Sequence, residues 1–207
     1  MIDPLSLLTY TAIVAGFVFI PGPATLLTMA RATGSGTRAG IATAFGIAVG
    51  DVIHTILAVI GLSAIVFASA VAFTVVKYLG AAYLIYLGLK AIFASRPRSD
   101  RPVQVVTPRR AFRQAILAEL LNPKTALFFV AFLPQFVVPE NGAVMMQLAI
   151  FGAILIALGL LSTLIFAITA GHLSDWLRGN RTFQIWQGRV VGSIYCGLGL
   201  RLALQER

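Results

Sequence analysis

The chain has 207 residues, of which 58% are hydrophobic and only 11% charged, and its mean hydropathy is +0.91. Soluble proteins carry about 25% charged residues, so this composition indicates an integral membrane protein. The apolar runs leave room for roughly six helical crossings of about 20 residues each and for no extramembrane catalytic domain. The net charge of +9 does not indicate nucleic acid as a partner. The basic residues lie in short loops beside the apolar runs, where anionic membrane lipids and topology account for them.

The first apolar run extends from Leu5 to Ala30 and contains Pro21-Gly22-Pro23. Proline lacks a backbone donor and clashes with the preceding turn, and glycine adds flexibility, so we expect the helix to break there. Unpaired backbone groups are costly in hydrocarbon, and the break must therefore face a cavity or packed protein. Broken helices of this kind form the substrate sites of secondary transporters. A short polar loop is expected from Arg31 to Arg38.

Later apolar runs predict five more crossings. They are expected at 40–64, 72–93, 114–138, 143–171 and 185–204, with a hairpin near Ser63 to Ala72. A basic linker at 95–113 divides a first three-helix half, 1–94, from a second half, 114–207, within one all-α transporter domain covering 1–207. Because each half has three crossings, the halves enter the membrane from opposite sides, and an internal repeat must be inverted.

Lysine and arginine are unevenly distributed between the loops. The loops after the first, third and fifth crossings hold essentially all of the loop charge, whereas the loops after the second and fourth hold no Lys or Arg. Basic loops stay in the cytoplasm, so both termini are expected outside a multi-pass protein of the cell (inner) membrane.

A second break is predicted in the fourth crossing, at Asn122-Pro123-Lys124. Pro21 lies ten residues from Arg31, and Asn122 lies nine from Arg113. At a helical rise of about 1.5 Å per residue, both breaks lie roughly 14 to 15 Å from the cytoplasmic boundary. This is the midplane of a core about 30 Å thick. The sequence thus predicts one solute site at the midplane, with one helix break on each side. The residues expected to bind the solute are Pro21, Gly22, Pro23, Asn122, Pro123 and Lys124.

Asp51 is the one carboxylate of the second crossing and lies thirteen residues past Arg38, roughly 20 Å along a straight helix. Deep carboxyl groups usually face the bundle interior and mark proton or substrate paths, although one can also serve only to hold helices together. His54 follows on the same face and is either a proton relay or a packed hydrogen-bonding residue. Lys124 needs a partner in hydrocarbon, and Asp51 and Glu119 are the nearest candidates by depth.

Gly46 and Gly50 form a GxxxG pattern in the second crossing. Small residues at this spacing let helices approach closely, either within one chain or across a homodimer. We favour a seam within the chain, because a bundle of broken helices needs close backbone contact inside.

Other functions fit the sequence less well. Gly61-Leu62-Ser63-Ala64 resembles the serine motif of intramembrane proteases, but the available His172 is expected about 25 Å or more away, at the other face of the core. A membrane scaffold without transport explains the arginines but neither break. The single Cys196 excludes an intramolecular disulfide or CxxC relay. A metal exporter is a further alternative, but beyond His54 and Cys196 the apolar runs offer few soft ligands. No metal or other cofactor is expected.

Two motifs carry a family resemblance. The first is Pro21-Gly22-Pro23, with Arg31, the Gly-rich stretch to Gly40, and Gly46-Ile47-Ala48-Val49-Gly50-Asp51; the second is Asn122-Pro123-Lys124-Thr125-Ala126-Leu127-Phe128-Phe129 with Phe132-Leu133-Pro134-Gln135-Phe136. In these motifs, and in length and hydrophobic profile, the chain resembles the LysE/RhtB superfamily of amino-acid exporters from end to end. The resemblance implies export of amino acids or close derivatives from the cytoplasm, driven by proton antiport.

One residue departs from the family pattern. Glu119 stands three residues before Asn122, where the pattern usually has asparagine. This extra carboxylate can pair with Lys124, bind a substrate ammonium group or alter coupling. We therefore expect a secondary exporter of a small zwitterionic solute, with Asp51 as proton carrier and His54 as a candidate relay. Lys124 either tunes Asp51 or holds the substrate carboxylate.

Overall fold

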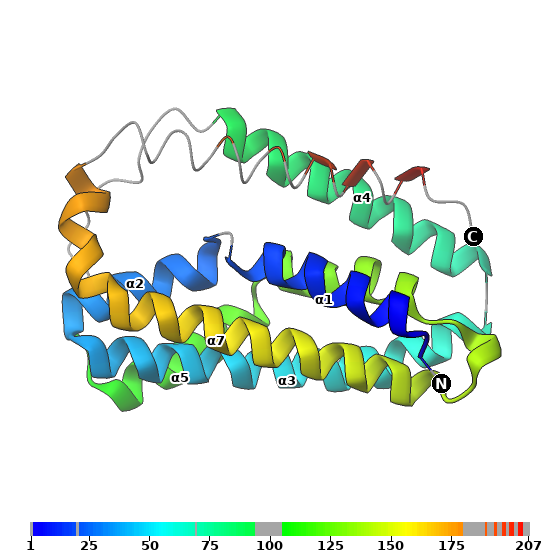
Figure 1. Cartoon of the computed structure of the whole chain (residues 1–207), viewed down its shortest axis with the longest axis horizontal. Coiled ribbons are helices and arrows are strands. Elements are labelled where there is room, and N and C mark those ends of the chain that lie inside the picture. Colours follow the sequence, from blue (N-terminus) through cyan, green and yellow to red (C-terminus); the bar gives the residue numbers. More distant parts are fainter. Residues whose placement is uncertain are drawn as a thin grey trace.

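The computed structural model describes residues 2–19, 21–68, 70–93 and 105–179, together with positions 189, 193, 196, 197, 199, 200, 203 and 204. Within these residues all regular secondary structure is helical, and the long helices lie roughly along one axis (Figure 1). The segments Thr37–Gly61 and Val144–Ala170 are long and apolar enough to cross a membrane, and a bent pair of helices at the N-terminus qualifies as a third crossing. The all-α membrane class is confirmed, whereas the arrangement of six helices as an inverted repeat stays a prediction.

The first crossing is broken where the sequence predicts it. Helix α1 (Pro4–Phe19) and helix α2 (Pro23–Ser35) meet at an angle of 45°. Pro21 and Pro23 carry no N–H, so the carbonyls four residues earlier have no helical partner. The result is two half-helices joined at Gly22.

The prediction of a polar loop from Arg31 to Arg38 is wrong. Helix α2 continues through Arg31 to Ser35, and Gly36 alone separates it from helix α3 (Thr37–Ala68). Gly36 has a φ of 89°, a conformation that glycine adopts without steric cost, and so a single residue reverses the chain. Gly40 then lies against Ala32, where a Cβ on the glycine would be 2.6 Å from the alanine Cβ.

Helices α3 and α4 (Ala70–Phe93) run in opposite directions, and their ends fall within the predicted hairpin near 63–72 (Figure 1). Both exceed the crossings predicted at 40–64 and 72–93. A hydropathy pattern marks the apolar core of a helix but not its polar ends, which explains the difference.

The fourth crossing is a chain of short helices. Helix α5 (Pro108–Leu120) begins before the expected start at Gln114, because Thr107 caps it and Pro108 occupies its first turn. Three arginines assigned to the linker, Arg109, Arg110 and Arg113, therefore lie in a helix.

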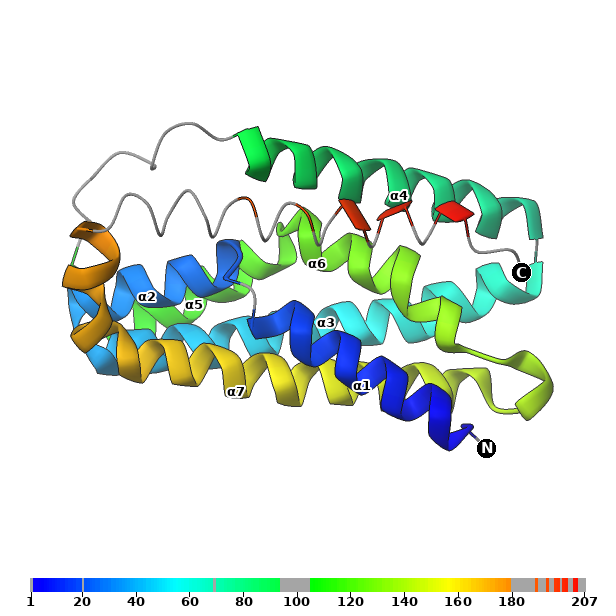
Figure 2. The same cartoon turned by 45° about the horizontal axis from the view of Figure 1, so that its top comes forward.

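After a break at Leu121 and Asn122, the chain continues through α6 (Pro123–Leu127), the π-helical η1 (Phe128–Phe132) and the 3-10 helices η2 (Leu133–Phe136) and η3 (Pro139–Asn141). Figure 2 shows α6 and the turns that follow it between α3 and α4.

Helix α7 (Val144–Gly179) extends past the predicted end at Gly171. The last crossing, predicted at 185–204, lies outside the described residues except for isolated positions. The side chains of Ser63 and His172, on which the protease alternative depends, also lie outside the described part of the chain.

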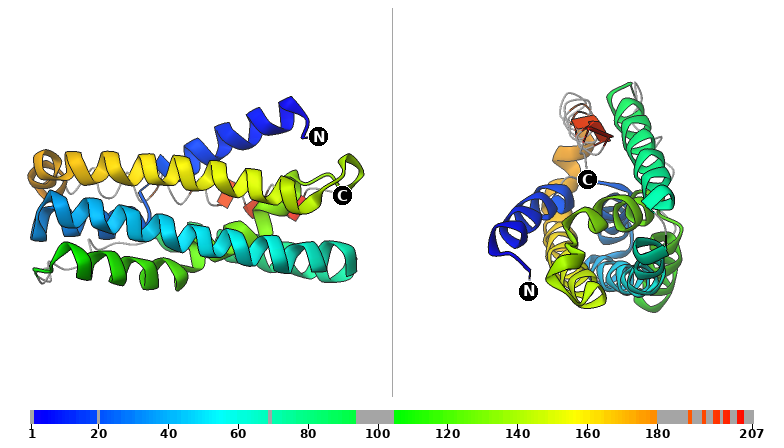
Figure 3. Two further views of the ribbon diagram at one scale, coloured as in Figure 1. Left: turned by 90° about the horizontal axis from the view of Figure 1, so that it is seen from below. Right: turned by 90° about the vertical axis from the view of Figure 1, so that its right-hand side faces the viewer.

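Packing places α3 between α5 and α7, and the two broken helices, α1–α2 and α5–α6, run in opposite directions (Figures 1 and 3). An aromatic core joins α1, α7 and the turns after α6. It contains Tyr10, Phe128, Phe129, Phe132 and Phe151. The Tyr10 hydroxyl donates a hydrogen bond of 2.9 Å to the Phe151 carbonyl, which ties α1 to α7.

Candidate functional site

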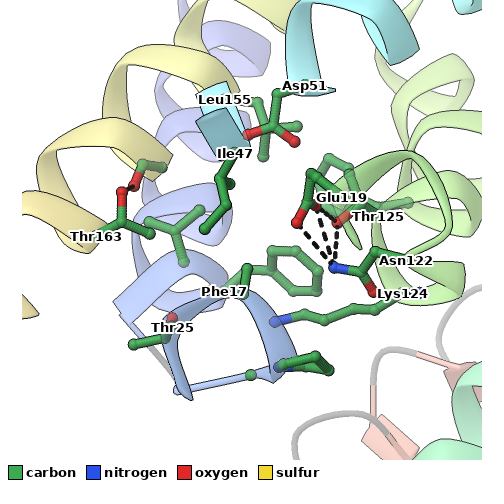
Figure 4. A pocket seen from close by; sticks show the side chains of 16 residues that line it. Phe17, Thr25, Ile47, Asp51, Glu119, Asn122, Lys124, Thr125, Leu155 and Thr163 are labelled. Carbon is green, nitrogen blue, oxygen red and sulfur yellow. Dashed lines mark hydrogen bonds between the residues drawn. The ribbon is translucent and has the colours of Figure 1, made fainter. Parts of the chain in front are cut away.

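A cavity of about 60 Å³ lies where the two helix breaks meet (Figure 4). On the same measure one water needs about 10 to 15 Å³, so the cavity holds several waters or the polar end of a small solute. Its walls come from α1, α2, α3, α5, α6, η1 and α7. The polar side chains are Thr25, Asp51, Glu119, Asn122, Lys124, Thr125 and Thr163, and the apolar ones include Phe17, Val18, Ile47, Phe128 and Leu155.

The first break presents open backbone to this cavity. Gly22 is the N-cap of α2 and, having no side chain, supplies no capping hydrogen bond. Ala24 and Thr25 in the first turn line the cavity. Thr25 is only 4% exposed, and its hydroxyl has no hydrogen bond among the described residues. One carbonyl is satisfied from outside the helix, since Ser162 of α7 donates to the Val18 carbonyl at 2.8 Å.

The second break satisfies its own polar groups. The Asn122 side chain accepts from the Lys124 backbone N–H at 3.1 Å, which caps α6. Its amide donates to both Glu119 carboxylate oxygens, at 3.1 and 3.2 Å, and to the Thr125 hydroxyl at 3.0 Å. Thr125 also donates to Glu119, as the dashed lines of Figure 4 show. The Glu119 carboxylate is therefore held in place.

His54 serves the same break. Its Nε2 lies 3.0 Å from the Glu119 carbonyl, which Pro123 cannot pair because it has no N–H. A carbonyl only accepts, so Nε2 carries the proton and donates. The imidazole stacks on Phe129 with the ring centres 5.8 Å apart.

Lys124 spans the distance between the two breaks. Its ammonium lies 4.1 Å from the centre of the Phe17 ring, within the range of a cation–π interaction. A Cβ placed on Gly22 would lie 2.9 Å from the same Nζ, so the lysine reaches the N-cap of α2. The charges of Glu119 and Asp51 both act on it.

Asp51 lies on α3, is 6% exposed, and is close to both α5 and α7. Its Oδ2 lies 3.7 Å from the position of a Cβ on Gly159. The charges of Glu119 and Lys124 both act on this carboxyl group. The cavity thus holds a carboxyl pair and an ammonium group, drawn from three helices.

The structure brings together most of the predicted binding residues. Gly22, Pro23, Asp51, Glu119, Asn122 and Lys124 line one cavity. Pro21 and His54 are not among the described residues that line it, and Pro123 contributes the first backbone position of α6.

Gly46 and Gly50 lie at the contact of α3 with α5. A Cβ on Gly46 would be 2.4 Å from the Phe112 carbonyl oxygen, and one on Gly50 would be 2.6 Å from the Glu119 Cβ. The second glycine therefore presses directly on the residue that carries the carboxylate.

Sequence reasoning missed Thr25, Thr163 and the apolar wall. Thr25 stands two residues after Pro23, and its place in the first turn after a helix break was a usable signal. Thr163 gave none, because a threonine that bonds its own helix, here to the Gly159 carbonyl at 2.8 Å, is common in membrane helices.

A cavity formed at two helix breaks, lined by ionisable groups and enclosed by apolar helices, is typical of membrane transporters. The chain belongs to the LysE type translocator family, whose model matches residues 15–206. It is therefore a membrane transporter and not an enzyme.

Relatives in several bacteria match nearly the whole chain. The membrane protein YrhP of Bacillus subtilis is 36% identical over 96% of this chain and 99% of its own length. A membrane protein of Pseudomonas aeruginosa is 30% identical over 94% of this chain and 93% of its own length. The leucine efflux protein of Salmonella typhimurium is 31% identical over 98% of both chains. No solved structure matches.

Proposed function

We propose that the protein exports amino acids or related small zwitterions from the cytoplasm in exchange for protons. The observation that carries this proposal is the placement of Asp51, Glu119 and Lys124 in one cavity with apolar walls. Relatives named as leucine efflux proteins support an amino acid as the solute. Apolar walls such as Ile47 and Leu155 suit an aliphatic side chain.

Orientation follows from the basic residues. The end of α2, the starts of α3 and α5 and the end of α7 gather at one end of the bundle, on the left of Figure 1. Arg31, on α2, donates to the Gln114 side chain on α5 at 2.9 Å, and Arg38 lies in the first turn of α3. We assign this end to the cytoplasm by the positive-inside rule, with the N-terminus outside the cell (inner) membrane.

The carboxyl pair supplies the coupling. Asp51 and Glu119 hold either a proton between them or the ammonium group of a substrate, because both would be cations at the same acceptors. A proton entering from outside displaces the solute, and a solute entering from the cytoplasm displaces the proton. A site that binds either the proton or the substrate ammonium group, but never both together, is sufficient for antiport. In this scheme His54 positions Glu119 through the Glu119 carbonyl and relays no proton.

The test is Asp51→Asn in proteoliposomes loaded with labelled leucine and exposed to a pH jump. Loss of the titratable group should lower the flux driven by the proton gradient tenfold or more. Leucine–leucine exchange without a gradient should fall less, because the asparagine carbonyl still accepts a hydrogen bond from the ammonium group. Metabolite profiling of cells with and without the protein gives the solute to use if leucine is not carried.

The matched control is Asp3→Asn, which makes the same change at an exposed residue that caps α1 through a 2.9 Å bond from the Ser6 N–H. Its flux should equal that of the unaltered protein. An Asp51→Asn protein with undiminished flux and unchanged pH dependence would rule out the carrier role.

A further inference from the structure

We propose that the first break is the subsite for the carboxylate of the transported zwitterion, formed by the N-terminus of α2, the Thr25 hydroxyl and the Lys124 ammonium. This proposal rests on the proposed function, which leaves open how the solute is oriented. It assigns the carboxylate group to Gly22–Thr25 and the neighbouring ammonium group to Asp51 and Glu119.

The first argument is the state of the α2 terminus. Gly22 cannot cap it, and Pro23 has no N–H, so the first backbone donors are those of Ala24 and Thr25. Both residues line the cavity. A helix of this length, 13 residues, carries roughly half a positive charge at its N-terminus, which favours an anion.

The second argument is the Thr25 side chain. It is buried to 4% exposure on the cavity wall, and its hydroxyl has no hydrogen bond among the described residues. Buried hydroxyl groups normally have a partner, because leaving one unpaired is costly. A carboxylate oxygen at the α2 terminus provides that partner, since a hydroxyl can donate to it.

The third argument is the position of Lys124. Its ammonium approaches Gly22, so a full positive charge lies beside the positive end of a helix. An anion that lies between these two positive charges is attracted by both of them. Glu119 acts on Lys124 as well, but Asn122 and Thr125 hold its carboxylate at the second break.

The second break does not offer an equivalent subsite. The Asn122 side chain already accepts from the Lys124 N–H at 3.1 Å and occupies the place that a ligand carboxylate would take. The Glu119 carboxylate beside it repels a second anion and attracts a cation. The two breaks therefore differ in polarity, and the solute has one favoured orientation.

The experiment compares three probes on the purified full-length protein. The probes are L-leucine, L-leucinamide, which lacks the carboxylate, and 4-methylpentanoate, which lacks the amine. In competition against labelled leucine, leucinamide should bind about tenfold or more weakly than leucine. This is the effect expected from losing hydrogen bonds to a charged group. Thr25→Val should weaken leucine about tenfold and leave leucinamide unchanged, whereas Thr25→Ser should retain the preference.

The control is Thr28→Val, one turn along α2, where the hydroxyl bonds the Ala24 carbonyl of its own helix at 3.0 Å. It should leave the ratio of leucine to leucinamide affinity unchanged. Leucinamide competing as well as leucine, an equal effect of Thr25→Val on both, or no thermal stabilisation by either carboxylate probe would overturn the subsite. If either of the first two results is found together with leucine flux in proteoliposomes, the subsite is rejected but export is not. The expected ratios without flux in proteoliposomes would support the subsite and reject export.

Discussion

Both helix breaks contain proline, but only one of them has a side chain that caps the helix that follows. At Asn122 a side chain caps α6, and Glu119 and Thr125 complete the network. At Gly22 there is no side chain to cap α2, and the Thr25 hydroxyl makes no hydrogen bond among the described residues. Each break receives one donor from another helix, from His54 and Ser162 respectively. The comparison teaches that a proline break becomes a fixed scaffold or an open binding surface according to the residue at its N-cap.

The largest expected effect is at the scaffold. Asn122→Ala removes the cap of α6, worth about 1 kcal/mol, and two hydrogen bonds to Glu119, worth roughly 1.5 to 3 kcal/mol for a charged acceptor. We expect the free energy of unfolding in detergent to fall by about 2 to 4 kcal/mol. Asn122→Ser, which keeps a capping oxygen, should recover the smaller part. Equal losses in the two variants would contradict separate capping and carboxylate contributions.

A smaller effect is expected from glycines near each break. A Cβ on Gly50 meets the Glu119 side chain at 2.6 and 2.9 Å, whereas one on Gly16 meets nothing within 4 Å. Gly50→Ala should cost about 1 to 3 kcal/mol through overpacking, and Gly16→Ala should stabilise α1 by roughly 0.5 to 1 kcal/mol. Thermal denaturation of both proteins in one detergent checks this. A stabilised Gly50→Ala protein would show that the α3–α5 contact is not tight.

The smallest expected effect is at the donor to the first break. Ser162→Ala leaves the Val18 carbonyl without its partner and should cost about 0.6 to 1.7 kcal/mol, the range for hydrogen bonds between membrane helices. Thr169→Val is the comparison, because that exposed hydroxyl bonds the Ile165 carbonyl of its own helix at 2.7 Å. If both substitutions lower the free energy of unfolding equally, the hydrogen bond between helices at the break does not stabilise the protein.

The helix breaks and the deep carboxyl were predictable because they depend on local chemistry. Proline lacks an N–H wherever it stands, and Asp51 within an apolar run must face the interior. The ends of helices were less predictable. Arg31 to Arg38 looked like a loop because it is polar, but arginine, alanine and threonine are tolerated in a helix, and Gly36 alone makes the turn.

Contacts between distant residues were beyond a single sequence. The bond from Ser162 to Val18 joins residues 144 positions apart, and nothing in the local pattern of either residue signals it. The roles of the neighbours of Glu119 also depended on three-dimensional packing. Asn122 was predicted to bind solute, which stays a prediction. In the structure it lines the cavity, and its side chain bonds Lys124, Glu119 and Thr125.

The one-residue turn at Gly36 has a mechanical consequence. Helices α2 and α3 are joined by that residue and lie in close contact at Ala32 and Gly40. Thr25 lies on one helix of this pair and Asp51 on the other, and both line the cavity. The short connection and the close contact limit how far the two helices can separate, and they limit the distance between these two cavity residues as well.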